Sequence, residues 1–338
     1  MSTYKIPRAD TLKAIIVRTD QDNRPLRWQE VPDPSYGPDE VLVDVHAAAL
    51  NRADLMQRAG NYSPPPGASD ILGLEMAGRI AAMGSQVRDW QTGDRVCALL
   101  IGGGYAEQVN VPHQMLIPIP DNWSFEQGAA LPEVFFTAFV NLFIEANVQA
   151  GETVLIHGGA SGVGTAAIQL ARQAGCQVIV TAGTAEKTAR CSELGANLAI
   201  NYRQEDFVEK TLAHTEAQGV DVILDIVGAA YLDRNLKLLK LRGRLVFISL
   251  LGGAQAELNL GPLLQRRLRL IGSVLRPRSL EEKIGIKQRF IDHFWPQLLD
   301  GTIQPIIDSV YPIEQANEAH RHMMANKNIG KIILQISQ

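Results

Sequence analysis

The chain has 338 residues, of which 46% are hydrophobic, and a formal net charge of −4. A chain of this length and composition can bury sizeable cores, which predicts a globular protein of two domains. The charge is spread without long acidic or basic blocks, so it gives no reason to expect a nucleic acid or an anionic membrane as partner.

Residues 1–8 lack the apolar core of a signal peptide, and we expect no segment long and apolar enough to span a bilayer. The default prediction is therefore a soluble, cytoplasmic protein without a membrane partner. The three cysteines, Cys97, Cys176 and Cys191, form no C-x-x-C pair and no disulfide framework. We expect them to be buried, reduced thiols.

The segment before residue 128 is rich in Pro and Gly. Short strand-like runs at residues 13–18, 40–49 and 78–83 are separated by clusters of turn residues. This pattern predicts an irregular, largely β domain. Near the C-terminus, residues 313–325 have a helical pattern and residues 331–336 a strand-like one. We expect that last strand to return to the β domain, which makes the domain discontinuous.

From residue 151 onward, strand and helix patterns alternate. Such alternation predicts right-handed βαβ units and a parallel sheet covered by helices on both faces. Gly175 and Gly195 stand just past two of the helical patterns and mark their ends. The expected strands are residues 153–157, 177–182, 198–201, 220–226, 244–249 and 268–273.

A turn of small residues, GGASGVG at residues 158–164, joins a buried strand to a helix. Small residues there let backbone N–H groups at the helix N-terminus approach a pyrophosphate, so the turn predicts a dinucleotide cradle. Ser161 stands where the G-x-G-x-x-G fingerprint has its second glycine. The alternatives are a turn that binds nothing and a hydrolase nucleophile elbow, against which Val163 argues because it replaces the last glycine of G-x-S-x-G.

The next strand end favours NADPH over NADH. In NAD-binding units an acidic residue about 20 residues after the glycines binds the adenosine ribose. Here residues 182–184 are Ala, Gly and Thr, which leaves room for a 2′-phosphate, and Lys187 in the next helix offers a countercharge. The ordinary interpretations stay open at this point: Lys187 as a solvated helix residue and Glu186 as a first-turn acid.

Residues 51–62 (NRADLMQRAGNY), 64–67 (PPPG) and 72–78 (LGLEMAG), with 93–96 (GDRV), the turn at 158–164 and 328–334 (NIGKIIL), closely resemble the medium-chain dehydrogenase/reductase superfamily. The similarity is to its zinc-free quinone oxidoreductase branch, more to the tumour-suppressor-inducible type than to the zeta-crystallin type. The resemblance implies an α/β fold with two domains. A GroES-like, mainly β substrate domain would comprise residues 1–128 and 276–338, and a Rossmann domain with a doubly wound parallel sheet residues 129–275. It also implies a cleft between the domains and a homodimer or homotetramer.

Zinc-dependent relatives carry Cys where this chain has Asn51, His where it has Leu74, and a further Cys beyond the Pro132 region. Among the corresponding positions only Glu75 is a plausible ligand, and three cysteines cannot build a four-cysteine zinc lobe. We therefore expect no catalytic metal. Without a Lewis acid, reduction of an electron-poor acceptor fits better than alcohol dehydrogenation.

The resemblance implies that Asn51, Asp54 and Tyr62 line the site beside the nicotinamide, where Asn51 and Tyr62 would hydrogen-bond the acceptor oxygen. Asn51 is equally well placed to cap a helix over residues 52–58, and Tyr62 to be a packing aromatic. The residues implied for the cofactor are Thr137 for the nicotinamide ribose or amide; Ser161, Gly162 and Val163 for the pyrophosphate; Gly183, Lys187 and Tyr202 for the 2′-phosphate; Ser249 and Leu251 for the nicotinamide side; Ser273 and Leu275 for the cleft wall; and Asn328 from the tail.

The sequence thus predicts an NADPH-dependent quinone reductase. One alternative is an alkenal or enone double-bond reductase, for which Tyr62 is the obvious proton donor. Another is an NADPH-binding protein with an RNA-binding or structural role and little turnover. The basic residues 266–269 lack interleaved aromatics, so we interpret them as solvated residues beside an edge strand and expect no nucleic acid partner. That strand, at residues 268–275, could pair across a dimer axis.

Overall fold

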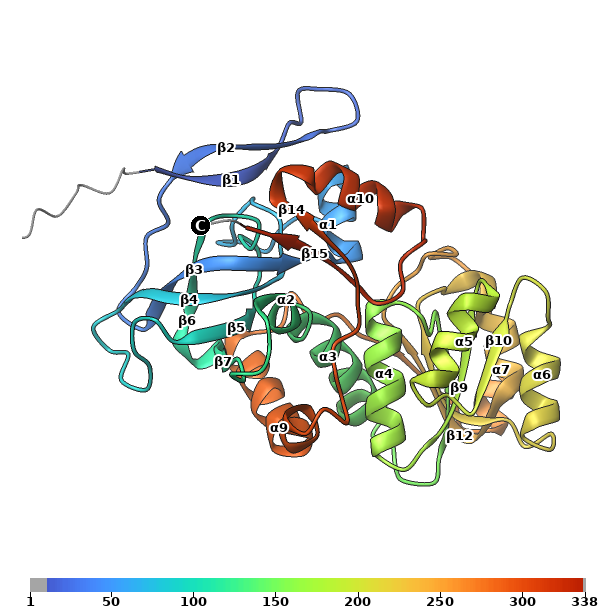
Figure 1. Cartoon of the computed structure of the whole chain (residues 1–338). Coiled ribbons are helices and arrows are strands. Elements are labelled where there is room, and N and C mark those ends of the chain that lie inside the picture. The colour runs from blue at the N-terminus through green and yellow to red at the C-terminus, as the bar shows by residue number, and fades with distance from the viewer. Residues whose placement is uncertain (1–10, 337–338) are drawn as a thin grey trace, which may run out of the picture. The chain divides into compact units, whose positions relative to one another are not determined.

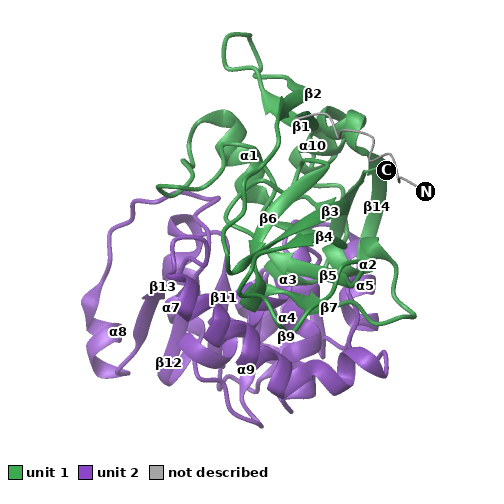
Figure 2. Ribbon diagram, turned by 90° about the vertical axis from the view of Figure 1, so that its left-hand side faces the viewer, with its two compact units in different colours: residues 1–133, 307–338 green, residues 134–306 purple. Residues whose placement is uncertain are grey.

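The computed structural model describes residues 11–336. The chain divides into two compact units: unit 1 is residues 1–133 with 307–338, and unit 2 is residues 134–306 (Figure 2). Each unit contains its own β-sheet, and all three cysteines are buried and free, as predicted.

Unit 1 contains the irregular β domain that the sequence predicts. Its seven-stranded sheet has the order β14-β15-β3-β4-β5-β7, and β6 pairs with β3. The strand β15 pairs antiparallel with β3 through Ile333 and Ala49, so the C-terminal strand returns to the β domain as predicted. The strands are β3 (Glu40–Ala49), β4 (Glu75–Met83), β5 (Arg95–Leu99), β6 (Gln108–Pro112), β7 (Ile117–Pro118), β14 (Ile307–Pro312) and β15 (Lys331–Gln335).

A separate two-stranded antiparallel sheet of unit 1 pairs β1 (Thr11–Val17) with β2 (Leu26–Pro32). The helices of this unit are α1 (Arg52–Ala59), α2 (Phe125–Ala129) and α10 (Ala316–Met324), with short 3₁₀ turns η1 (His113–Met115) and η4 (Ile313–Gln315) (Figure 1). The helical pattern predicted at residues 313–325 corresponds to η4 and α10.

Unit 2 contains a six-stranded parallel sheet in the order β10-β9-β8-β11-β12-β13. This order, with the chain stepping outward in one direction from β8 and then in the other from β11, is that of doubly wound dinucleotide-binding sheets. The strands are β8 (Thr153–His157), β9 (Gln177–Ala182), β10 (Leu198–Asn201), β11 (Val220–Asp225), β12 (Leu239–Phe247) and β13 (Arg269–Gly272). The predicted parallel sheet is confirmed.

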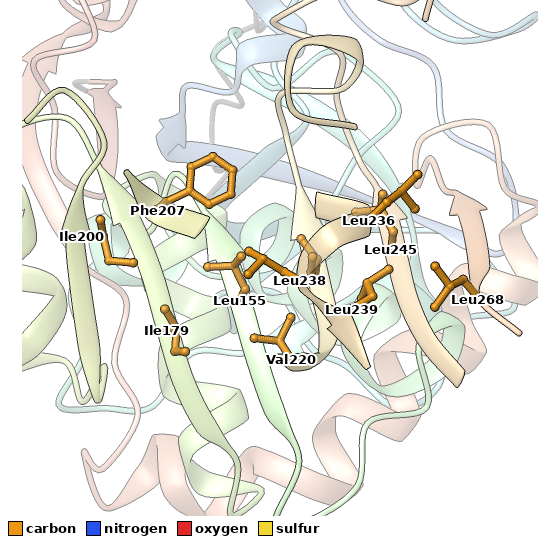
Figure 3. Packing of buried hydrophobic residues seen from close by; sticks show 11 residues of the cluster. Leu155, Ile179, Ile200, Phe207, Val220, Leu236, Leu238, Leu239, Leu245 and Leu268 are labelled. Atoms are coloured by element: carbon orange, nitrogen blue, oxygen red, sulfur yellow. The ribbon is translucent and has the colours of Figure 1, made fainter. Parts of the chain in front are cut away.

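Helices connect and cover these strands: α4 (Gly162–Gln173), α5 (Ala185–Glu193), α6 (Phe207–His214), η3 (Ala229–Tyr231), α7 (Leu232–Leu238) and α8 (Leu260–Gln265). Leu155 of β8 and Ile179 of β9 are fully buried, and they join a cluster with Phe207 of α6 and Leu236 of α7 (Figure 3). Burial of both sheet faces explains why these strands read as continuous apolar runs.

Helix α9 (Leu280–Leu299) packs inside unit 2. Its Phe290 ring lies 6.0, 5.4 and 5.8 Å from the rings of Phe135, Phe136 and Phe139, which all lie on α3 (Pro132–Phe139). Residues 276–306 belong to the same compact unit as the parallel sheet, whereas the sequence assigned residues 276–338 to the substrate domain. The functional domain boundaries stay a prediction.

Within residues 11–336, one segment is long and apolar enough to cross a membrane by length and composition, so the prediction that none exists was wrong. The segment is Phe125–Glu145, which runs through α2, α3 and the π-helical η2 (Val140–Glu145), with a mean hydropathy of 1.3. A buried core helix can be as long and as apolar as a membrane-spanning helix. Since 72% of the apolar window of this segment is buried inside the protein, its hydropathy reflects core packing.

Candidate active site

Most residues predicted to bind the cofactor lie just beyond the carboxyl ends of the parallel strands of unit 2. Because neighbouring parallel strands end at the same edge of a sheet, the fold gathers these positions along one edge, where doubly wound sheets bind their ligands. The residues are Ser161, Gly162 and Val163 after β8, Gly183 after β9, Tyr202 after β10, Ser249 and Leu251 after β12, and Ser273 after β13.

The turn after β8 is tightly packed. A Cβ on Gly159 would lie 2.7 Å from Cβ of Val180, and one on Gly164 would lie 2.3 Å from the carbonyl oxygen of Gly158. Ser161 is the N-cap of α4, and its Oγ accepts a hydrogen bond of 3.0 Å from the Gly164 N–H. A hydroxyl that accepts this bond still has its proton to donate. The geometry therefore suits an anion at the N-terminus of α4.

At the end of β9, Gly183 lies against the ring of Tyr202: a Cβ on Gly183 would be 2.9 Å from the Tyr202 hydroxyl oxygen. Thr184 caps α5 by accepting a hydrogen bond of 3.2 Å from the Lys187 N–H. The structure therefore brings Gly183, Tyr202 and the backbone of Lys187 to two neighbouring strand ends. No acidic residue lies in the segment between Ala182 and Ala185.

The remaining predicted residues of unit 2 are held by local contacts. The N–H of Leu251 donates to the carbonyl of Ile226 (3.1 Å), and the hydroxyl of Ser273 accepts from Nη2 of Arg278 (3.3 Å). Leu275 is 7% exposed, and its side chain is part of the core. Thr137 lies on α3, away from the strand ends along the chain, and its carbonyl accepts from Nδ2 of Asn141 (2.7 Å).

In unit 1, Asn51 belongs to a buried ionic cluster with Glu75 and Lys331. Nζ of Lys331 donates to Oε1 of Glu75 (2.7 Å), to Oδ1 of Asn51 (2.7 Å) and to the carbonyl of Leu50 (2.6 Å). Nδ2 of Asn51 donates to Oε1 of Glu75 (2.9 Å) and to the Ala49 carbonyl (3.3 Å). Both amide hydrogens of Asn51 thus have acceptors within the protein.

Asp54, one turn along α1, is also buried and fully engaged. It accepts hydrogen bonds from the N–H groups of Asn51 (2.8 Å) and Gly73 (3.1 Å) and from the Tyr105 hydroxyl (3.1 Å). Burial raises the pKa of Asp54 to about 6, although these hydrogen bonds oppose the rise. Asn51 is the N-cap of α1, as its alternative interpretation predicted. The Asp54 carboxylate accepts the hydrogen bond from the Asn51 backbone N–H.

Tyr62 and Asn328 complete the predicted site residues of unit 1. Tyr62 lies half-buried in the loop that follows α1. Asn328 precedes β15 and donates through Nδ2 to the carbonyl of Gly330 (2.8 Å). The structure brings Asn51 and Asp54 together, and leaves Tyr62 and Asn328 on two separate loops.

The donor set does not fit a zinc site. Within residues 11–336, no group of three or more His, Cys, Asp or Glu side chains is arranged to hold a metal. Glu75, the ligand that the sequence left open, has Oε1 against the Lys331 ammonium and Oε2 accepting the Glu133 N–H (2.8 Å).

Sequence reasoning missed Lys331 and Tyr105 in unit 1, and a buried set in unit 2 consisting of His157, Thr181, Asp225 and Asn235. A signal for the second set existed: each of the apolar strands β8 and β11 ends on a polar residue, His157 and Asp225 respectively. No local signal connects Lys331 with Glu75, because 256 residues separate them along the chain.

Comparisons with known proteins agree with this architecture. The family profile described as alcohol dehydrogenase GroES-like domain matches residues 37–121, and the one described as zinc-binding dehydrogenase matches residues 162–286. The quinone oxidoreductase of Rattus norvegicus is 34% identical over 300 residues, which cover 87% of this chain and 88% of that protein.

Solved structures give the same picture. A quinone oxidoreductase from Pseudomonas syringae pv. Tomato DC3000 matches with a TM-score of 0.85 and 29% identity, over 96% of this chain and 99% of that one. The CurK enoyl reductase matches with a TM-score of 0.85 and 28% identity, over 97% and 100%.

The chain belongs to the medium-chain dehydrogenase/reductase superfamily. It combines a GroES-like domain with a Rossmann domain, as the sequence predicted. Within the superfamily it is a member of the quinone oxidoreductase branch. The protein is therefore an oxidoreductase, in a family whose members bind a nicotinamide dinucleotide.

Proposed function

We propose that this protein is an NADPH-dependent quinone oxidoreductase, which transfers hydride from NADPH to a quinone without a metal ion. The observation that carries the NADPH assignment is the end of β9, where Gly183 lies against Tyr202 and α5 begins with Lys187 close by. An NAD-specific site would place a carboxylate there. The quinone assignment is supported by the quinone oxidoreductases to which the chain is similar.

In this proposal the N–H groups at the start of α4 bind the pyrophosphate, together with the hydroxyl proton of Ser161. Lys187 and Tyr202 bind the 2′-phosphate, by charge and by hydrogen bonding respectively. The bound cofactor supplies the hydride. The protein's part is to hold the nicotinamide and the acceptor in contact and to exclude water.

We assign the polarising role toward the acceptor to Tyr62, whose hydroxyl can donate a hydrogen bond to the oxygen on which charge develops. Asn51 and Asp54 serve as positioning residues in this scheme, because their polar atoms already bind Glu75, Lys331, Gly73 and Tyr105. They fix the start of α1 and thereby the loop that carries Tyr62.

The test is oxidation of NADPH and of NADH by the purified protein with a panel of ortho- and para-quinones. We expect turnover with quinones and tighter binding of NADPH than of NADH. Equal affinity for the two cofactors would contradict the NADPH assignment, and no turnover with any quinone would contradict the substrate class.

A second candidate is reduction of an enone or alkenal double bond, which the similarity to the CurK enoyl reductase favours. This reaction needs the same hydride donor, and also a proton for carbon, which Tyr62 would supply. Rates with matched enones and quinones distinguish the two reactions. A Tyr62→Phe variant should lose much more of its rate with enones than with quinones if the enone reaction is the natural one.

We also propose that two copies of the chain form a dimer through β13, the last strand in the sheet order of unit 2. Unpaired edges of this kind tend to be covered, and apolar side chains near β13 are well exposed: Leu264 is 81%, Leu260 62% and Val274 57% exposed. Light scattering on the eluting protein tests this, with a homotetramer as the alternative result and a monomer as the result that overturns it. The cytoplasmic location stays a prediction.

A further inference from the structure

Four polar side chains are buried together beneath the carboxyl edge of the parallel sheet, and none of them belongs to the predicted site. They come from β9, β8, α7 and β11, and each is 0–1% exposed: Thr181, His157, Asn235 and Asp225. Burying a polar group is costly unless it is hydrogen-bonded, so a set of four at one place calls for a reason.

Hydrogen bonds connect the four side chains in a single chain. Oγ1 of Thr181 lies 3.0 Å from Nδ1 of His157, and Nε2 of His157 lies 2.8 Å from Oδ1 of Asn235. Nδ2 of Asn235 then donates to Oδ2 of Asp225 at 3.2 Å. We name this set the strand-end chain.

The carboxylate gives the strand-end chain a direction. An ionised Asp225 only accepts, so the Asn235 amide must turn its NH₂ toward Asp225 and its oxygen toward His157. His157 then carries its proton on Nε2, which leaves Nδ1 to accept the Thr181 hydroxyl proton. Burial lowers the pKa of His157 to about 4, in agreement with a neutral ring. Each donor in the chain therefore points toward Asp225.

At one end, the strand-end chain holds the loop after β11. Asp225 accepts from the N–H groups of Val227 (2.6 Å) and Gly228 (3.1 Å), and Gly228 has a φ of +81°. The neighbouring Ile226 packs under the turn after β8, because a Cβ on Gly158 would lie 2.4 Å from its Cδ1. A shift of the β11 loop would therefore also move the turn proposed to bind the pyrophosphate.

The other end of the strand-end chain reaches the remaining cofactor loops. The carbonyl of Thr181 accepts the Gly159 N–H (2.9 Å), and Thr181 lies two residues before Gly183. His157, in the middle, directly precedes Gly158. One hydrogen-bonded chain thus ties together the ends of β8, β9 and β11.

Aromatic rings enclose the centre of the strand-end chain. The His157 ring meets the rings of Phe207 and Tyr231 edge-on, each at a centroid distance of 5.0 Å. The guanidinium of Arg234 lies over Phe207, 3.9 Å from its centroid. In such surroundings a broken hydrogen bond is poorly replaced by water, so the loss of one member should displace the others.

We propose that the strand-end chain positions the loops after β8, β9 and β11 for the nicotinamide dinucleotide, with Thr181, His157, Asn235 and Asp225 acting as positioning residues. The inference rests on the proposed function, since it needs a cofactor at this edge of the sheet. The four side chains act through the loops and do not themselves contact the cofactor.

The binding test uses Asn235→Ala and Thr181→Val in the full chain, with the dissociation constants for NADPH and NADH measured by fluorescence titration and the melting temperature measured in parallel. We expect affinity to fall about tenfold in Asn235→Ala and roughly threefold in Thr181→Val, which keeps the backbone bond to Gly159. The matched control is Thr211→Val: Thr211 is a fully buried threonine on α6 of the same unit, and Oγ1 has no hydrogen-bond partner among the residues that the structure describes. Its affinity should stay within about twofold.

The direction of the strand-end chain has its own readout, which needs no cofactor. In ¹⁵N NMR spectra the unmodified protein should show His157 protonated on Nε2. A proton on Nδ1 of His157 in the unmodified protein overturns the assigned direction.

The outcomes separate the inference from the proposed function. If the unmodified protein binds neither dinucleotide, the proposed function fails, and the positioning role with it. If it binds one of them and both Asn235→Ala and Thr181→Val bind it as tightly as Thr211→Val does, the positioning role alone is overturned. The positioning role would also be overturned if Thr211→Val lost as much affinity and as much melting temperature as Asn235→Ala and Thr181→Val do. Affinity would then follow the stability of the protein alone.

Discussion

Each unit contains a buried polar cluster, and the two clusters are held in different ways. In unit 1, Glu75 and Lys331 form an ion pair whose side chains are 0% and 3% exposed respectively. Asn51 is hydrogen-bonded to both of them. In unit 2, the Asp225 carboxylate has no cation among the partners that lower its pKa, and it is held by N–H donors from Val227, Gly228 and Asn235. Burial accordingly raises the pKa of Asp225 to about 6.

The buried histidines differ in the same way. His157 in unit 2 has a hydrogen-bond partner at each ring nitrogen. His320 on α10 of unit 1 is fully buried, and neither of its ring nitrogens has a hydrogen-bond partner among the described residues. The comparison teaches that the Asn51, Glu75 and Lys331 cluster of unit 1 is held by charge compensation and His320 by packing alone. The strand-end chain of unit 2 instead uses directed hydrogen bonds beneath the loops that would bind the cofactor.

The sharpest test of charge compensation is Lys331→Met. Removing the ammonium leaves Glu75 buried without its cation and Asn51 without a donor, which should cost about 3–5 kcal/mol of unfolding free energy. The double variant Lys331→Met with Glu75→Gln removes both charges and should recover a large part of that loss. Urea unfolding monitored by tryptophan fluorescence measures both variants. Equal stability of the single and double variants would show that the cluster is not held by its charges.

His320→Leu tests a buried histidine without partners. Burial lowers the pKa of His320 from 6.5 to about 3, with a smaller contribution from the charge of Arg58. Since the folded-state pKa is the lower one, the neutral ring contributes stability that is present above pH 6.5 and is lost as the pH falls toward 3. The loss reaches about 3 kcal/mol by pH 4.

The variant should therefore lose less stability than the unmodified protein between pH 6.5 and pH 4, as measured by urea unfolding at a series of pH values. The carboxyls of Asp54 and Asp225 act in the opposite sense, because their raised pKa values favour the folded state as the pH falls, and comparison of the two proteins cancels their effect. The exposed His214 on α6 provides the control variant His214→Leu, which should keep the acid slope. An unchanged slope in His320→Leu would contradict the assignment.

Lys187→Ala tests the proposed 2′-phosphate site of unit 2. Loss of a charged contact to phosphate should weaken NADPH binding by about 10- to 100-fold and leave NADH binding nearly unchanged. Lys210→Ala is the control, since Lys210 is a lysine on the following helix α6 that pairs with Glu205. Isothermal titration with both cofactors gives the result, and an equal loss for NADPH and NADH would place Lys187 outside the 2′-phosphate site.

The sequence predicted local features of unit 2 well. The strands at 153–157, 177–182 and 198–201 match the structure residue for residue, because each is a short apolar run closed by a sharp turn. The strand predicted at 244–249 begins earlier, at Leu239, and the register between β11 and β12 shifts there, which no local pattern indicates. Residues 158–164 could be predicted as the tight turn between β8 and α4 because the whole motif is contiguous.

The buried polar networks could not be predicted in the same way, since their members are far apart in sequence. Lys331 is 280 residues from Asn51, and His157 is 78 residues from Asn235. The composition of a single segment carries no information about such a partner. The resemblance pointed to Asn51 and Asp54 as residues beside the nicotinamide, which stays a prediction. No sequence pattern indicates that Asn51 binds Lys331 or that Asp54 binds Tyr105.

Ser161→Gly has the smallest expected effect and tests what the serine adds to the cradle. Glycine is a tolerated N-cap, so the helix should lose only a few tenths of a kcal/mol, whereas Ser161→Ala should lose about 1 kcal/mol. If the hydroxyl proton also reaches the pyrophosphate, both variants should bind the cofactor roughly three- to tenfold more weakly, in spite of their different stabilities. If Ser161→Ala, the less stable variant, also binds the cofactor more weakly than Ser161→Gly, then Ser161 acts only by capping α4. Titrations with NADPH and thermal melts on the two variants decide between these roles, because the backbone N–H groups of the turn are common to both.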